Sequence, residues 1–151
     1  MRYPDYSLPL AGFSLIAALI AGPALAHVHA TTPSGHRGDR IEITLDIGHG
    51  CAGKPTTDLL IAVPKGLEQA EPLPVQGWTT TAAPGQVGWT GGTLADHDKG
   101  SFTFAATISA DAPAEIIVPV VQRCGSDALR WIDPNPAADN PAPTIKVLPA
   151  K

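Results

Sequence analysis

Charged residues are scarce in this chain of 151 residues. Asp, Glu, Lys and Arg make up 16% of the sequence, the net charge is −4, and Lys and Arg form no run or cluster. Proteins that bind nucleic acids or anionic membrane surfaces through electrostatic attraction carry such basic clusters. The composition therefore argues against both kinds of partner.

Long apolar runs are also absent, apart from one that extends from Leu10 to Leu25. No other run approaches the ~20 residues of a membrane-spanning helix. The one long run ends in Ala24-Leu25-Ala26, the small-residue pattern that precedes a secretory cleavage site. We therefore predict a signal peptide over residues 1–26, a single mature domain over residues 27–151, and a periplasmic or secreted product. The alternative is that the apolar run stays uncleaved and anchors the protein in a membrane.

Cysteine occurs only twice, as Cys51 and Cys124, and there is no Cys-x-x-Cys spacing. Thiolate metal sites typically use such short spacings, so a cysteine metal site is disfavoured. In an oxidising compartment two cysteines most often pair with each other. We expect a Cys51–Cys124 disulfide, which would stabilise the fold by roughly 4 kcal/mol in the chain-entropy model.

A sustained helical period is missing as well, and the 16 prolines and 15 glycines lie mainly between short apolar runs. Residues 40–47 alternate apolar and polar side chains, the pattern of a half-buried strand. Pro119 suggests a bulge or an edge position in the strand expected at 115–121. The other strands are expected within 30–38 and at 59–63, 78–81, 86–90, 101–105, 129–132 and 144–148. Eight or nine short strands separated by turn residues predict an all-β fold, an antiparallel β-sandwich.

The predicted cleavage would make His27 the first residue of the mature protein. The free α-amine and the Nδ1 atom of this residue can close a chelate ring on one metal ion, an arrangement called a histidine brace. Copper(II) favours square-planar nitrogen and oxygen sites, so the brace suits copper(II). His29 lies two residues further along and would share a strand face with His27, which makes it a second candidate ligand. The alternative is that His27 follows the cleavage site by chance and lies free in solvent.

Seven short motifs follow one another along the mature chain. They are His27-Val28, Gly50-Cys51-x-Gly53-Lys54-Pro55-Thr56-Thr57, Val63-Pro64-x-Gly66, Gly77-Trp78, Val87-Gly88-Trp89, Val120-Val121-Gln122-x-Cys124 and Arg130-Trp131-Ile132. In this order and spacing they resemble the YcnI-like family of exported copper-binding proteins. The resemblance covers essentially the whole mature chain, and it implies an immunoglobulin-like β-sandwich with a copper(II) site built on a single N-terminal histidine.

The resemblance also implies roles for individual residues. In that family the first histidine gives its amine and ring nitrogen to copper, and a tryptophan near the C-terminal end sits beside the metal. These roles would fall to His27 and Trp131. Some members add a carboxylate from the loop before a Thr-Thr strand, but residues 47–51 contain no Asp or Glu. His49 in this loop is the obvious replacement as third ligand. His29 is a second difference from the family pattern, in which Thr is common at that position.

These features lead us to expect an exported copper(II)-binding protein that serves copper homeostasis or trafficking and is not an enzyme. Its partners would be the copper ion and another periplasmic copper carrier or a membrane copper transporter. A histidine brace is also the core of lytic polysaccharide monooxygenases. Those enzymes add a second histidine and a flat aromatic surface, whereas aromatic residues make up 5% of this chain. A further alternative is a structural β-sandwich interaction domain with an accidental N-terminal histidine.

Overall fold

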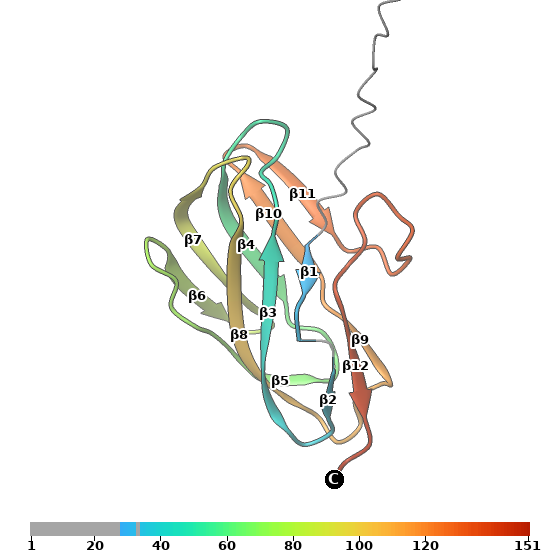
Figure 1. Cartoon of the computed structure of the whole chain (residues 1–151). Helices are drawn as coiled ribbons and strands as arrows, with labels where there is room; N and C mark the ends of the chain where they lie inside the picture. The colour runs from blue at the N-terminus through green and yellow to red at the C-terminus, as the bar shows by residue number, and fades with distance from the viewer. Residues whose placement is uncertain (1–27, 33) are drawn as a thin grey trace, which may run out of the picture.

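The computed structural model describes residues 28–32 and 34–151, and this part of the chain is built from strands and loops (Figure 1). The strands are β1 (His29–Ala30), β2 (Ser34–His36), β3 (Arg40–Ile47), β4 (Thr56–Ala62), β5 (Leu67–Pro72), β6 (Thr79–Ala83), β7 (Gln86–Leu94), β8 (Gly100–Ile108), β9 (Glu115–Ile117), β10 (Val120–Cys124), β11 (Asp127–Trp131) and β12 (Thr144–Leu148). The described residues contain no helix suited to crossing a membrane. The predicted signal peptide and His27 lie outside the described residues.

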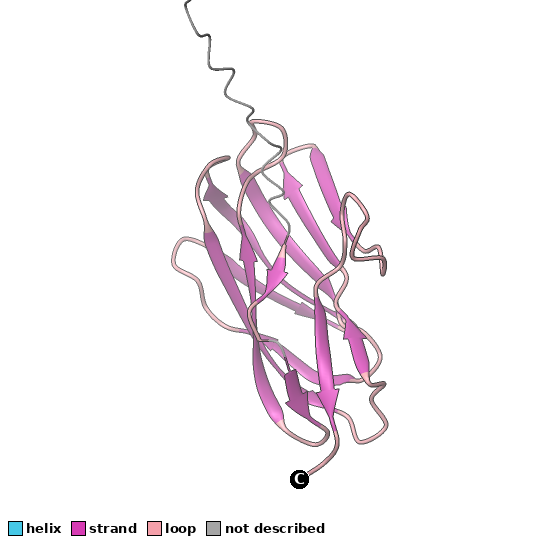
Figure 2. Ribbon diagram, turned by 45° about the vertical axis from the view of Figure 1, so that its right-hand side comes forward, coloured by secondary structure: helices cyan, strands magenta, loops and turns pink. Residues whose placement is uncertain are grey.

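Two larger β-sheets form the body of the molecule, and their strands run roughly along one long axis (Figure 2). The four-stranded sheet has the order β1-β3-β8-β5, and the five-stranded sheet has the order β11-β10-β4-β7-β6. A small sheet, β2-β12-β9, lies toward the end of the molecule that carries the C-terminus (Figure 1), and its β2–β12 pair is parallel. All other strand pairs of the described residues are antiparallel. The predicted antiparallel β-sandwich is therefore confirmed.

The hydrophobic core lies between the two larger sheets. Side chains of a strand point alternately to its two faces, and in β3 Ile43, Leu45 and Ile47 are buried while Glu42 is exposed. The other large side chains that are fully buried and apolar are Leu59, Ile61, Trp89, Phe102, Phe104, Ile108, Ile116 and Ile145. Each buried side chain of this size contributes roughly 1.5–3 kcal/mol relative to exposure. The alternating pattern in the sequence thus sets which face of each sheet is internal.

The prediction of one strand over residues 115–121 is wrong in one respect, because the chain forms two strands there. β9 joins the small sheet, whereas β10 joins the five-stranded sheet. Pro119 lies between them, and its carbonyl accepts a hydrogen bond from the Ala62 amide at 3.2 Å. Proline has no amide hydrogen to give to a sheet, so it ends one ladder and lets the chain cross to the next.

β5 was not predicted from the sequence. Its central residues are mostly polar, and it is an edge strand of the four-stranded sheet, so no apolar alternation marks it. Its register against β8 shifts between Glu68 and Glu71, where Gln69 has a φ of 51°. Arg40 fixes this bulge, because its guanidinium donates to the Gln69 carbonyl at 3.2 Å and to the Glu71 carboxylate at 3.2 Å.

The predicted disulfide is confirmed. Cys51 lies in the loop between β3 and β4, and Cys124 is the last residue of β10. Their Cα atoms are 5.8 Å apart, and the bridge joins residues that are 73 positions apart in the sequence. The disulfide therefore ties the loop that carries His49 to the five-stranded sheet.

Candidate metal centre

The loop from Gly48 to Pro55 has a conformation that its glycines and hydrogen bonds determine. The Gly50 amide donates to the Asp96 carbonyl at 2.9 Å, and Cys51 and Lys54 exchange backbone hydrogen bonds of 3.0 and 3.1 Å. A Cβ atom at Gly50 would lie 1.9 Å from the Lys54 carbonyl oxygen, so no other residue fits there. The backbone on both sides of Gly50 is thus fixed, including that of His49.

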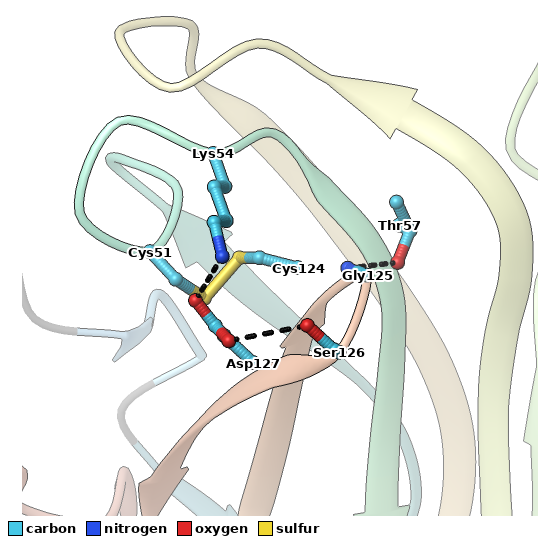
Figure 3. A network of polar contacts seen from close by, with 7 residues as sticks. All are labelled: Cys51, Lys54, Thr57, Cys124, Gly125, Ser126 and Asp127. Carbon is cyan, nitrogen blue, oxygen red and sulfur yellow. Dashed lines mark hydrogen bonds and ion pairs between the residues drawn. A yellow bond between two sulfur atoms is a disulfide. The ribbon is translucent and has the colours of Figure 1, made fainter.

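Polar contacts join the same loop and the start of β4 to the hairpin of β10 and β11 (Figure 3). The Lys54 ammonium donates to the Asp127 carboxylate at 2.6 Å, and this hydrogen bond lowers the pKa of the Asp127 carboxyl below its ordinary value. The Gly125 amide, in the turn between the two strands, donates to the Thr57 hydroxyl at 3.2 Å. Both contacts are exposed and each adds little stability alone, but with the disulfide they hold loop and hairpin together.

A buried polar network lies directly beneath the loop. The Gln122 side chain is 0% exposed, and its amide nitrogen donates to the His49 carbonyl at 2.6 Å and to the Thr56 hydroxyl at 2.7 Å. Its amide oxygen accepts a hydrogen bond of 3.0 Å from the indole nitrogen of Trp131, which is 3% exposed. Both hydrogens and the oxygen of the amide therefore have partners. One side chain links the His49 backbone to the Trp131 ring.

The His49 ring is half-buried and lies beside the Trp131 ring, with ring centroids 6.2 Å apart and an interplanar angle of 66°. Its Nδ1 atom is hydrogen-bonded to the Gly50 carbonyl. A carbonyl oxygen can only accept, so Nδ1 carries the hydrogen in this contact. The neutral imidazole then keeps its lone pair on Nε2, the state in which a histidine binds a metal through that atom. The structure thus brings together two of the residues expected at the site.

His29 belongs to a different element, the short strand β1 at an edge of the four-stranded sheet. It is exposed and pairs in register with Asp46 of β3. Val28, the preceding residue, is 3% exposed and packs in the core. His29 also lines a hollow of about 260 Å³ against the proline-containing segment before β12. The start of the described chain is therefore anchored against the sandwich.

No three His, Cys, Asp or Glu side chains come together as a metal-binding group within residues 28–32 and 34–151. A copper site at His49 would therefore draw on a donor beyond these residues, and His27 is the expected one. The brace itself stays a prediction.

Gln122 and Thr56 are the site residues that sequence reasoning missed. Both are buried and polar, and Gln122 lies between Val120 and Cys124 on the inward face of β10. A polar residue at an inward position of an apolar strand indicates a buried hydrogen-bond network, because buried polar groups are almost always paired. The inward position of Gln122 was therefore a usable signal, although its partners could not be named from the sequence.

The family model described as "Domain of unknown function (DUF1775)" matches residues 27–87 and 80–147. The chain belongs to this family. No curated protein matches the sequence. The DUF1775 match spans nearly all of the predicted mature domain, and the description of the family assigns no activity.

One solved structure supports the fold of this DUF1775 chain, and others match it with lower TM-scores. A protein from Nocardia farcinica with an immunoglobulin-like fold is 20% identical, with a TM-score of 0.68, and the match covers 83% of this chain and 99% of that one. A cohesin from Clostridium thermocellum is 14% identical, with a TM-score of 0.47 and coverage of 81% and 98%. The sixth cohesin of scaffoldin B from Acetivibrio cellulolyticus is 9% identical, with a TM-score of 0.48 and coverage of 81% and 98%. The first similarity confirms the expected immunoglobulin-like sandwich.

Proposed function

We propose that this protein is exported, binds copper(II) and serves copper homeostasis or trafficking, as its resemblance to the YcnI-like family implies. The observation that carries the proposal is the placement of His49, whose Nδ1 is hydrogen-bonded to the Gly50 carbonyl and whose ring lies 6.2 Å from that of Trp131. In this position His49 can replace the carboxylate that the loop supplies in some members of the family that the sequence resembles, beside the tryptophan that the resemblance places next to the metal.

The position of the family match supports the predicted mature start. The DUF1775 match begins at His27, the residue that follows Ala24-Leu25-Ala26. Val28 is buried and β1 pairs with β3, so the backbone is held directly after the proposed amine donor. A held backbone reduces the entropy that a terminal chelate loses when it binds a metal.

The donor set suits copper(II) in its chemistry. The amine and Nδ1 of His27 would supply two nitrogens, and Nε2 of His49 would supply a third, all of them ligands that copper(II) prefers. Each nitrogen must be unprotonated to bind, so affinity falls as the pH is lowered. Copper is the cargo in this proposal. We expect the copper-loaded protein to release no oxidised oligosaccharide from polysaccharide in the presence of peroxide.

The test is a calorimetric titration with copper(II) of the protein that begins at His27. We expect one site tighter than micromolar. The matched control carries one additional glycine before His27, which moves the free amine away from the imidazole and should abolish the tight site. Unchanged affinity in the extended protein would rule out the brace, and a lack of tight binding in both proteins would rule out the proposed function.

A further inference from the structure

Gln122 is the largest of the buried polar side chains among residues 28–32 and 34–151. It lies on the inward face of β10 between Val120 and Cys124, which are 0% and 1% exposed. In such surroundings an apolar side chain with apolar neighbours gives about the same stability as a hydrogen-bonded polar one. The contribution of the Gln122 amide is therefore sought in the geometry that it imposes on its partners.

The chemistry of its partners determines the orientation of the Gln122 amide. The His49 carbonyl can only accept a hydrogen bond, and the Trp131 indole N–H can only donate one. The amide nitrogen therefore faces His49 at 2.6 Å, and the amide oxygen faces Trp131 at 3.0 Å. The reversed amide would lose both hydrogen bonds. Gln122 is thus held in a single orientation between the two residues.

Thr56 completes the network on the side of the disulfide. Its hydroxyl oxygen accepts the second amide hydrogen of Gln122 at 2.7 Å. The same oxygen lies 4.0 Å from the Cys124 sulfur, which carries no hydrogen in the disulfide, so any hydrogen bond between these two atoms is donated by Thr56. Thr56 is 0% exposed. Solvent therefore does not compete for these contacts, and the inner end of the network is closed.

The outer end of the network fixes two aromatic rings. Gln122 binds the His49 carbonyl, and the Gly50 carbonyl binds the His49 Nδ1 atom, so both the backbone and the ring of His49 are held. The same Gln122 amide binds the Trp131 indole, whose ring centroid is 6.2 Å from that of His49. One side chain therefore sets the position of the expected copper ligand relative to the tryptophan.

We propose that Gln122 is a positioning residue that holds the His49 imidazole and the Trp131 indole in their metal-binding arrangement before copper(II) arrives. The copper part of this inference rests on the proposed function. Gln122 acts through His49, because its amide binds the backbone of that residue. A ligand that is held in advance loses less conformational entropy when it binds a metal. Partners that orient metal ligands typically change the affinity by about 10- to 100-fold.

The first part of the test uses the metal-free protein that begins at His27 and does not depend on copper. Nitrogen-15 NMR, at a pH where imidazole is neutral, should show a rigid His49 ring with its hydrogen on Nδ1. Gln122→Met should make this ring more mobile. It should also speed the exchange of the Trp131 indole hydrogen with solvent, because its acceptor is gone.

The second part measures copper(II) binding by calorimetry and paramagnetic resonance. Gln122→Met should weaken binding by about tenfold and alter the hyperfine splitting, with the number of bound nitrogens unchanged. Thr56→Val is the matched control, because it removes a buried hydrogen bond of the same amide but leaves the contact with His49 in place. Both variants should melt at a lower temperature. Thr56→Val should leave the affinity unchanged.

A mobile His49 ring in the unmodified protein would overturn the proposal, and this measurement holds even if Gln122→Met does not fold. Unchanged affinity and spectrum in folded Gln122→Met would also overturn it. Equal losses of affinity in Gln122→Met and Thr56→Val would assign the effect to the stability of the core and contradict the positioning role. A lack of tight copper(II) binding in the unmodified protein would refute the proposed function, and the NMR comparison would then decide separately whether Gln122 holds His49.

Discussion

Two buried tryptophans, Trp89 and Trp131, lie in parts of the core that differ in their polar contacts. Trp89 packs against Phe102, with ring centroids 5.3 Å apart, and its indole nitrogen donates to the Leu73 carbonyl at 2.7 Å. Trp131 donates instead to the side chain of Gln122, at 3.0 Å. The Trp89 contact ends at a backbone carbonyl, whereas the Trp131 contact continues through Gln122 to the His49 carbonyl.

The difference indicates what each region does. Around Trp89 the buried side chains are apolar, and their burial stabilises the fold without specifying a loop. Around Trp131 a polar side chain is buried, which is tolerated only because each of its groups is hydrogen-bonded. Such a network adds little net stability and mainly fixes geometry. The region around Trp131 therefore suits a site that must hold His49 in one orientation.

Loss of the disulfide should have the largest effect on stability. Cys51→Ser combined with Cys124→Ser should destabilise the fold by about 4 kcal/mol and lower the melting temperature by roughly 10–20 °C. Thermal unfolding of both proteins measures the loss. Thiol titration of the native, unreduced protein is the control and should find no free cysteine. Two reactive thiols there would contradict the bridge and reopen thiolate binding of copper(I).

Gln122→Met should have the next largest effect. It keeps the length of the side chain but leaves the Trp131 N–H and the His49 carbonyl without their partner, at a cost of about 2–3 kcal/mol. Leu59→Met is the matched control in an apolar environment and should cost less than about 1.5 kcal/mol, because it conserves volume. Urea unfolding of the two variants measures the free energy of unfolding that each one loses. Equal costs would mean that the polar network has no special structural role.

Trp131→Phe and Trp89→Phe compare the two halves directly. Both remove a buried ring and one N–H donor, so we expect similar losses of stability, of about 1–3 kcal/mol each. Trp131→Phe should also lower copper(II) affinity by about tenfold, because side chains that position metal ligands typically matter on this scale. Trp89→Phe should leave the affinity unchanged. Calorimetry on both variants tests this, and equal changes in affinity would place the site elsewhere.

Local patterns in the sequence predicted much of the fold. β3 has the bounds that its alternation indicated, and the strands expected at 78–81 and 86–90 correspond to β6 and β7. The split at Pro119 was missed because a single residue that crosses between sheets leaves no periodic signal. β5 was missed because an exposed, bulged edge strand needs no apolar face.

The candidate site was predictable in part. The resemblance pointed to Trp131, and the missing carboxylate pointed to His49. Their contact depends on a loop and a strand that are far apart in the sequence, and on Gln122 as the link between them. Side-chain partners across two elements follow from register and depth of burial, which one sequence does not specify. Conversely, sequence alone indicated His27, which lies outside the described residues.

Paramagnetic resonance of the copper(II)-loaded protein that begins at His27 tests the central claim most directly, because it counts the nitrogens bound to the metal. The account predicts that His49→Ala removes one nitrogen from the spectrum and weakens binding by about tenfold or more. His29→Ala should leave the nitrogen count unchanged and weaken binding less. The reverse order, with a nitrogen lost in His29→Ala and none in His49→Ala, would place the third ligand on β1 and contradict the account.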